Sequence, residues 1–226
     1  MLRAGEAPND VEPDTAVETD SRPRMATDKY WRRYHDAMAG ALQGLATTAT
    51  GGEPLDPEVA FERLCQWTRE VRAADGTIHF VGNGASACFS SHMAVDFTKN
   101  AGVRALAYND VAFLTALGND FGYDRAFADP VKWYAHKGDL LATISSSGNS
   151  ANVVKAIAAA REVGVRVVTF SGMKPDNKSR QAGDLNFYIK GWSYGLIECS
   201  HQVLLHAWLD RYMNVREWEM TKPQFT

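Results

Sequence analysis

From residue 76 onward, short apolar runs alternate with amphipathic segments along the chain. The apolar runs predict buried strands, and they cover 77–82, 103–109, 139–146, 165–172 and 185–190. The segments between them predict helices, the clearest of which cover 150–164 and 194–213. Strands that alternate with helices over short connections indicate an α/β domain with a parallel sheet, in which ligands bind beyond the carboxyl ends of the strands.

The region before residue 76 has a different pattern. Apolar residues at three- and four-residue steps from Tyr30 to Leu45 predict an amphipathic helix, and Asp56 is a candidate N-cap for a second one. A Thr/Gly-rich break, TTATGGEPLD, separates the two. The first 25 residues are polar and acidic, which predicts a disordered tail. The predicted organisation is a tail over 1–25, N-terminal helices over 26–75, a core domain over 76–213 and a C-terminal extension over 214–226.

Composition indicates the cellular compartment and the classes of partner that the chain does not favour. The chain has 226 residues, a net charge of −3 and a pI of about 6.1, which gives no support for a nucleic-acid or anionic-membrane partner. Its three cysteines, Cys65, Cys88 and Cys199, lack CxxC spacing and indicate a reducing cytosol. No apolar run approaches the roughly 20 residues of a membrane span, and the N-terminus lacks the apolar region of a signal peptide. We therefore expect a cytoplasmic protein.

Residues 144–152 read ISSSGNSAN and place four serines between a predicted strand and a predicted helix. These are Ser145, Ser146, Ser147 and Ser150. A helix N-terminus offers unpaired N–H groups and a partial positive charge, hydroxyls add neutral donors, and Gly148 allows close backbone approach. A helix cap alone would need one serine, and the GxSxG motif of a nucleophilic serine is absent. We interpret the segment as a loop that binds a phosphate dianion.

The loop after the first predicted core strand reads VGNGASA. Gly82, Gly84 and Ala87 match the GxGxxA outline of a dinucleotide-binding loop, and Asp110 follows the next strand. That acid comes later than the usual spacing of about 20 residues. An NAD-dependent enzyme therefore remains an alternative class. Our interpretation is a polar loop that contacts a sugar through Asn83, Gly84 and Ser86.

Titratable residues gather on two predicted helices. His92 and Asp96 are four residues apart on one, while Glu198, Gln202 and His206 follow one stripe of the other. Two imidazoles and two carboxylates suit a divalent ion such as Zn²⁺, and a carboxylate with an imidazole suits proton transfer. The alternatives are an ordinary surface pair on the first helix and a hydrogen-bonded core histidine on the second.

Several motifs together resemble the SIS (sugar isomerase) domain. They are GNGAS with the following His92 and Asp96, ALGNDFGYDRAF at 116–127, SSSGNSANVVKAIAAARE, and a last helix with Glu198 and His206. Over roughly 28–213 the chain resembles the phosphoheptose isomerases of that family. The resemblance implies a single three-layer sandwich with a five-stranded, mainly parallel sheet flanked by helices, plus N-terminal helices. It also implies conversion of sedoheptulose 7-phosphate to D-glycero-D-manno-heptose 7-phosphate through an enediol, for nucleotide-activated heptose biosynthesis.

The resemblance also implies a role for each matching residue. Phosphate contacts fall on the four serines, and further substrate contacts fall on Asn83, Gly84, Ala85, Ser86, Asn119 and Asp120. The catalytic carboxylate of the family falls on Asp96 and its catalytic histidine, which would assist ring opening, falls on His206. The Zn²⁺ positions reported for some members fall on His92, Asp96, Glu198 and His206. Relatives are homotetramers whose sites lie between subunits.

Three positions depart from the family pattern. The family has Glu where this chain has Asp96, Gln where it has Glu198, and Asp where it has Gly195. A shorter carboxylate at one position and a new one at the other leave either Asp96 or Glu198 as the base that moves a proton between C1 and C2. An isomerase or epimerase of another phosphosugar and a non-catalytic, protein-binding scaffold of the same fold are the alternative functions.

Overall fold

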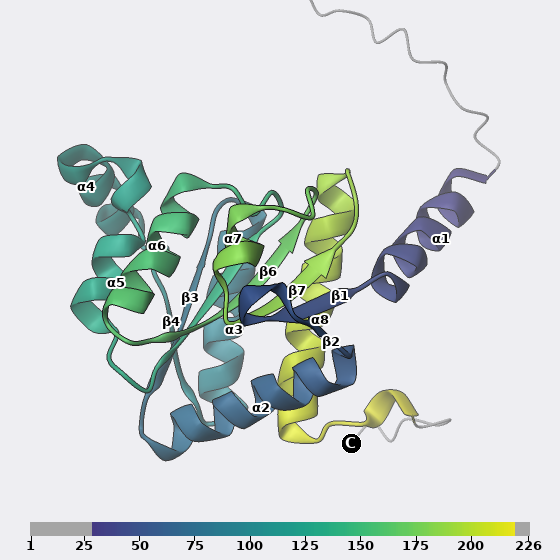
Figure 1. Ribbon diagram of the computed structural model, residues 1–226, viewed down its shortest axis with the longest axis horizontal. Coiled ribbons are helices and arrows are strands. Elements are labelled where there is room, and N and C mark those ends of the chain that lie inside the picture. The colour runs from purple at the N-terminus through teal and green to yellow at the C-terminus, as the bar shows by residue number, and fades with distance from the viewer. Residues whose placement is uncertain (1–28, 220–226) are drawn as a thin grey trace, which may run out of the picture.

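The computed structural model describes residues 29–219, so the tail predicted over 1–25 lies outside the described residues (Figure 1). Seven strands form one sheet in the order β2-β1-β7-β6-β5-β3-β4. The strands are β1 (Ala46–Ala49), β2 (Pro54–Leu55), β3 (Thr77–Gly82), β4 (Arg104–Ala107), β5 (Leu140–Ser145), β6 (Arg166–Gly172) and β7 (Leu185–Ile189).

The five strands predicted from apolar runs form the parallel part of this sheet. They lie side by side in the order β7-β6-β5-β3-β4. In β5, Leu140, Ala142 and Ile144 join one core cluster and Leu141 joins the other. Because both faces of the strand are buried, every position is apolar or packed, and the strand appears in the sequence as a continuous run rather than an alternating one.

The first two strands, β1 and β2, were not predicted from the sequence. β1 pairs antiparallel with β7, and β2 pairs antiparallel with β1. The sheet is therefore mixed and has seven strands, not the five mainly parallel strands that we expected. The sequence analysis predicts a break over 47–56, because this segment is short, threonine-rich and contains two adjacent glycines. Pairing with β7 nevertheless buries Thr47 and Thr48, and Asn186 Nδ2 donates to Thr48 Oγ1 at 3.3 Å.

Helices cover both faces of the sheet and give the expected three layers (Figure 1). One face carries α2 (Pro57–Ala73), α3 (Ala85–Lys99) and α8 (Tyr194–Met213). The other face carries α5 (Ala128–Tyr134), α6 (Ala151–Glu162) and the short α7 (Lys178–Ala182). Within residues 29–219, no helix is both long and apolar enough to cross a membrane.

The remaining elements lie outside these layers or connect them. They are α1 (Tyr30–Gln43), α4 (Val111–Phe121) and three single turns, η2 (Thr50–Gly52), η3 (Tyr123–Arg125) and η4 (Glu217–Glu219). α1 buries none of its side chains completely, and it extends away from the body of the molecule (Figure 1). α4, η3 and α5 together connect β4 to β5, and the apolar pattern of the sequence did not predict them.

Trp208 fixes the helices that carry the candidate site residues. Its ring is fully buried and lies 4.5 Å from the ring of Phe97 on α3, centroid to centroid. Its indole Nε1 donates to Thr68 Oγ1 on α2 at 2.9 Å. A large aromatic side chain with its polar atom satisfied stabilises the contact of α8 with both neighbours. The relative position of α3 and α8 is therefore set by the core.

Candidate active site

Two loops lie side by side at the carboxyl edge of the sheet. β3 and β5 are parallel neighbours, and Gly82 at the end of β3 is paired with Ile144 near the end of β5. The glycine loop, residues 82–86, follows β3, and the serine loop, residues 145–150, follows β5. The two loops suspected of contacting sugar and phosphate are thus brought together by strand pairing, as expected for ligand sites in parallel sheets.

The loops enclose a cavity of about 220 Å³. Six residues predicted to bind substrate line it, namely Asn83, Ser86, Ser145, Ser146, Ser147 and Ser150. Glu198 from α8 lines it too, together with Ile144 and Tyr194, which the sequence analysis did not propose. None of the lining residues carries a positive charge. The cavity therefore offers hydroxyl and amide groups and one carboxylate.

The backbone of the serine loop explains its glycine. Gly148 has φ +62°, and a Cβ there would lie 1.9 Å from Asn177 Oδ1. Only glycine fits this conformation and this close approach. Ser150 occupies the N-cap position of α6, yet its side chain makes no capping hydrogen bond within that helix. The Ser150 side chain therefore does not cap α6. Its hydroxyl remains available to a ligand at the N-terminus of this helix.

The candidate ribose ligand of the dinucleotide alternative has a structural role in this protein. Gly82 packs tightly, because a Cβ there would lie 2.8 Å from the Ile144 carbonyl oxygen. Asp110, the candidate ribose ligand, accepts a hydrogen bond from Phe113 N at 2.9 Å and caps α4. Its carboxylate is therefore occupied as a helix cap. This observation disfavours the NAD-binding alternative.

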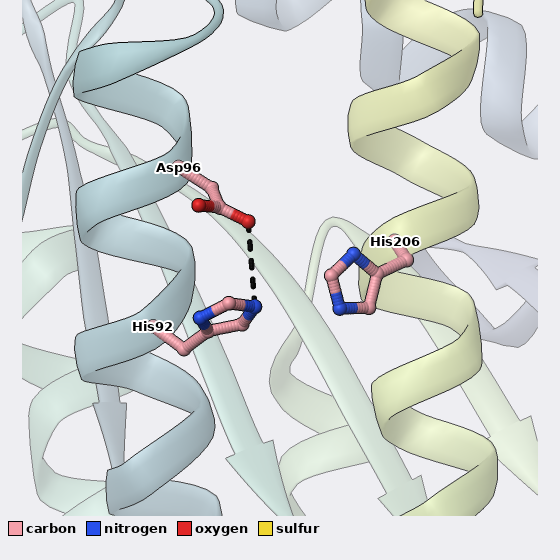
Figure 2. A group of neighbouring side chains, drawn as sticks. All are labelled: His92, Asp96 and His206. Atoms are coloured by element: carbon pink, nitrogen blue, oxygen red, sulfur yellow. Dashed lines mark ion pairs between the residues drawn. The ribbon is translucent and has the colours of Figure 1, made fainter. Parts of the chain in front are cut away.

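A second group of predicted residues meets between α3 and α8. Figure 2 shows His92 and Asp96 on α3 directed toward His206 on α8. One ligand atom from each lies within 4.8 Å of the others, and His92 Nε2 is 3.3 Å from Asp96 Oδ2. The two imidazole centroids are 5.2 Å apart. Two imidazoles and one carboxylate from two rigid helices are a donor set that fits a divalent ion with an open coordination position.

The predicted four-residue metal set is divided in the structure. Glu198 is absent from this group and lines the small cavity instead, eight residues before His206 on α8. Eight residues correspond to about two helical turns, or about 12 Å along the axis. The structure therefore brings His92, Asp96 and His206 together and places Glu198 with the serine and glycine loops.

The other predicted contacts lie outside the cavity lining. Gly84 and Ala85 belong to the glycine loop and the start of α3. Asn119 and Asp120 are exposed near the end of α4, where Asn119 Nδ2 donates to Asp120 Oδ1 at 2.8 Å. Gly195 faces α1, since a Cβ there would lie 3.3 Å from the Tyr34 hydroxyl.

A larger groove of about 820 Å³ lies beside His206, between α2, α8 and residues 214–219. Its walls carry four carboxylates, from Glu58, Glu62, Asp210 and Glu219, against the two guanidinium groups of Arg211 and Arg216. An anionic ligand would meet net repulsion there. The smaller cavity is therefore the better candidate for a phosphate group, despite its size.

Comparison with known proteins agrees with this geometry. A family model described as SIS domain matches residues 58–172. The phosphoheptose isomerase of Enterobacter sp. (strain 638) is 40% identical over 167 residues, covering 71% of this chain and 86% of that protein. The phosphoheptose isomerase of Escherichia coli (strain K12 / DH10B) is 35% identical over the same length and coverage.

The chain belongs to the SIS domain family, in the branch of the phosphoheptose isomerases. The structure of the phosphoheptose isomerase from Neisseria gonorrhoeae superposes with a TM-score of 0.71 at 28% identity, covering 83% of this chain and 99% of that one. A phosphoheptose isomerase from Francisella tularensis shares the fold with a TM-score of 0.73 at 20% identity, covering 84% and 100% of the two chains.

One histidine of this SIS domain is a buried structural group. His201 is fully buried on α8, and burial lowers the pKa of its imidazole to about 4. The folded protein therefore holds His201 neutral at pH values where the unfolded chain, with an ordinary pKa of about 6.5, binds a proton. Proton uptake by the unfolded chain makes the free energy of unfolding decrease as pH falls from about 6.5 to about 4.

We predict that His201→Gln flattens this pH dependence. From the two pKa values, the imidazole accounts for about 3 kcal/mol of lost stability between pH 6.5 and pH 4. The measurement is urea unfolding at several pH values, comparing slopes rather than absolute stabilities. His35→Gln, a change of an exposed histidine in α1, is the matched control and should keep the wild-type slope. An unchanged slope in His201→Gln would contradict the assignment.

Proposed function

We propose that this protein is an aldose–ketose isomerase that converts sedoheptulose 7-phosphate to D-glycero-D-manno-heptose 7-phosphate, in the synthesis of nucleotide-activated heptose. One observation carries the proposal. The serine loop, the glycine loop and the Glu198 carboxylate line one cavity, in a chain 40% identical to a phosphoheptose isomerase. The cavity thus combines donors for a phosphate with a carboxylate that can move a proton.

The phosphate binds at the N-terminus of α6. Backbone N–H groups of the first turn and the partial positive charge of the helix favour a dianion there. The hydroxyls of Ser146, Ser147 and Ser150 add donors, and Ser145 Oγ accepts from Gly148 N at 3.2 Å, which braces the loop. Neutral donors hold the phosphate without a lysine or arginine in the lining. The sugar extends from this point along the glycine loop, past Asn83 and Ser86, with Asn119 and Asp120 as further predicted contacts.

The reaction needs one base that works at two carbons. Removal of the C1 proton from the open-chain ketose gives a cis-enediol, with O2 protonated. Return of the proton to C2 and loss of the O1 proton then give the aldose. We assign the carbon-to-carbon transfer to Glu198, because it lines the cavity whereas the Asp96 carboxylate is directed to His92. The family resemblance gives His206 the ring-opening step, in which an imidazole nitrogen that is not bound to a metal would move a proton between the ring oxygen and solvent.

The residues His92, Asp96 and His206 would hold a divalent ion, and Zn²⁺ suits their nitrogen and oxygen donors. When bound, such an ion supplies a Lewis acid that polarises substrate oxygens. Glu198, predicted as a fourth ligand, would then face the substrate about two turns before His206 on α8. In this arrangement Asp96 acts as a metal ligand beside His92.

The assembly is a homotetramer with sites between subunits, located in the cytoplasm. Support for assembly comes from exposed aromatic side chains beside the cavity, where Tyr194 lines the cavity and is 62% exposed and Trp192, two residues earlier, is 74% exposed. Exposed aromatic side chains clustered near a site are typical of surfaces that a partner covers. The three cysteines are free, which suits a reducing compartment.

The test of this function is an NMR time course of the purified protein with sedoheptulose 7-phosphate, run with added Zn²⁺ and with EDTA. We expect anomeric signals of an aldose phosphate in the first sample and their loss in the second. Conversion that EDTA does not affect would contradict the metal site. Thermal stabilisation by the sugar phosphate without conversion in either sample would favour the scaffold or another phosphosugar.

Two isosteric variants distinguish the roles of the Glu198 and Asp96 carboxylates. Glu198→Gln should lower kcat by about 100-fold or more, the usual scale for loss of a general base, at every Zn²⁺ concentration. Asp96→Asn should lose activity through weaker metal binding, and excess Zn²⁺ should restore part of it. Glu162→Gln, an exposed carboxylate paired with Lys132 on the surface, is the control and should keep wild-type turnover. Full activity in Glu198→Gln, with a metal-independent loss in Asp96→Asn, would place the base on α3.

A further inference from the structure

Three polar side chains from separate segments meet at Asn83, which lines the cavity. Asn83 follows β3, Asn152 lies in the first turn of α6, and Tyr123 belongs to η3. The two amides form a reciprocal pair, with Asn83 Nδ2 donating at 2.9 Å and Asn152 Nδ2 donating back at 2.8 Å. The Tyr123 hydroxyl donates to Asn83 Oδ1 at 2.9 Å. Neither Tyr123 nor Asn152 was a predicted site residue.

The donors and acceptors of this network allow one orientation of the Asn83 amide. The backbone N–H of Val153 donates to Asn152 Oδ1 at 3.0 Å, and a backbone N–H can only donate. Asn152 therefore presents its Nδ2 to Asn83 Oδ1. That oxygen also accepts from Tyr123, so both of its lone pairs are used. The free polar group that remains on the Asn83 amide is one N–H donor.

Tyr123 is anchored by ion pairs of the two residues that follow it in the chain. Its neighbour Asp124 pairs with Lys155 on α6. The next residue, Arg125, has its Nη2 2.8 Å from Asp129 Oδ2 on α5. The phenol is 56% exposed, so its ring contributes little to the core, and the hydrogen bond to Asn83 is its specific contact with the site.

We propose that Tyr123 is a positioning residue of this isomerase. By occupying the second lone pair of Asn83 Oδ1, it holds the amide so that Asn83 offers the substrate a donor and no acceptor. The site then selects an acceptor oxygen of the sugar at this point. The inference rests on the proposed function, because it assumes that the cavity lined by Asn83 binds the sugar phosphate.

The test compares Tyr123→Phe with wild type by calorimetric binding and by turnover of sedoheptulose 7-phosphate. Loss of one hydrogen bond that orients a binding group should raise the Kd and KM of the sugar phosphate about five- to tenfold, with kcat nearly unchanged. Inorganic phosphate, which binds the serine loop alone, should keep its Kd. Tyr134→Phe, a change of another half-exposed tyrosine outside the cavity lining, is the control and should behave as wild type.

A double-mutant cycle decides whether Tyr123 acts through Asn83. In an Asn83→Ala background, Tyr123→Phe should cause no further rise in the Kd of the sugar phosphate. An equal rise in both backgrounds, an unchanged Kd in Tyr123→Phe, or a parallel loss of inorganic phosphate binding would overturn the inference. Wild-type protein that binds the sugar phosphate without converting it would instead overturn the proposed isomerase activity, and the binding cycle would still test Tyr123.

Discussion

The parallel pairing of β3 with β5 is the constraint on which the site depends. It sets the ends of the two strands side by side, with Gly82 opposite Ile144. The absence of a side chain at Gly82 lets the strands and the first turn of α3 approach closely, because a Cβ would lie 2.7 Å from Ser86 Cβ. Amide and hydroxyl donors from two loops that are far apart in the sequence, over 82–86 and 145–150, can therefore surround one small ligand.

α8 connects the two halves of the site. One stripe of this helix presents Glu198 to the cavity and, about two turns further on, His206 to the pair on α3. Burial of Trp208 between α2, α3 and the sheet fixes the helix against its neighbours. In the proposed mechanism, the base and one metal ligand therefore come from different positions of one rigid helix. This division would explain why the chain has a carboxylate on each of the two helices, Asp96 on α3 and Glu198 on α8.

The sequence predicted the elements whose pattern is local. Each parallel strand is a run of apolar residues, and the serine loop combines strand end, glycine and helix start within nine residues. The hairpin over 46–55 was missed because its threonines are buried only by pairing with β7. Tyr123 and Asn152 were missed because each is an ordinary polar residue in its own segment. Their role depends on tertiary contacts with Asn83, which no sequence spacing indicates.

The central claim is that the Glu198 carboxylate in this cavity moves a proton between two carbons of a phosphosugar. The most direct measurement is the reaction of sedoheptulose 7-phosphate in D₂O with added Zn²⁺, followed by NMR. An enediol intermediate exchanges its proton with solvent through the base, so the account predicts an aldose phosphate that carries deuterium at C2. An aldose product that fully retains protium at C2 would indicate direct hydride transfer, and the absence of any aldose product would contradict isomerase activity at this site.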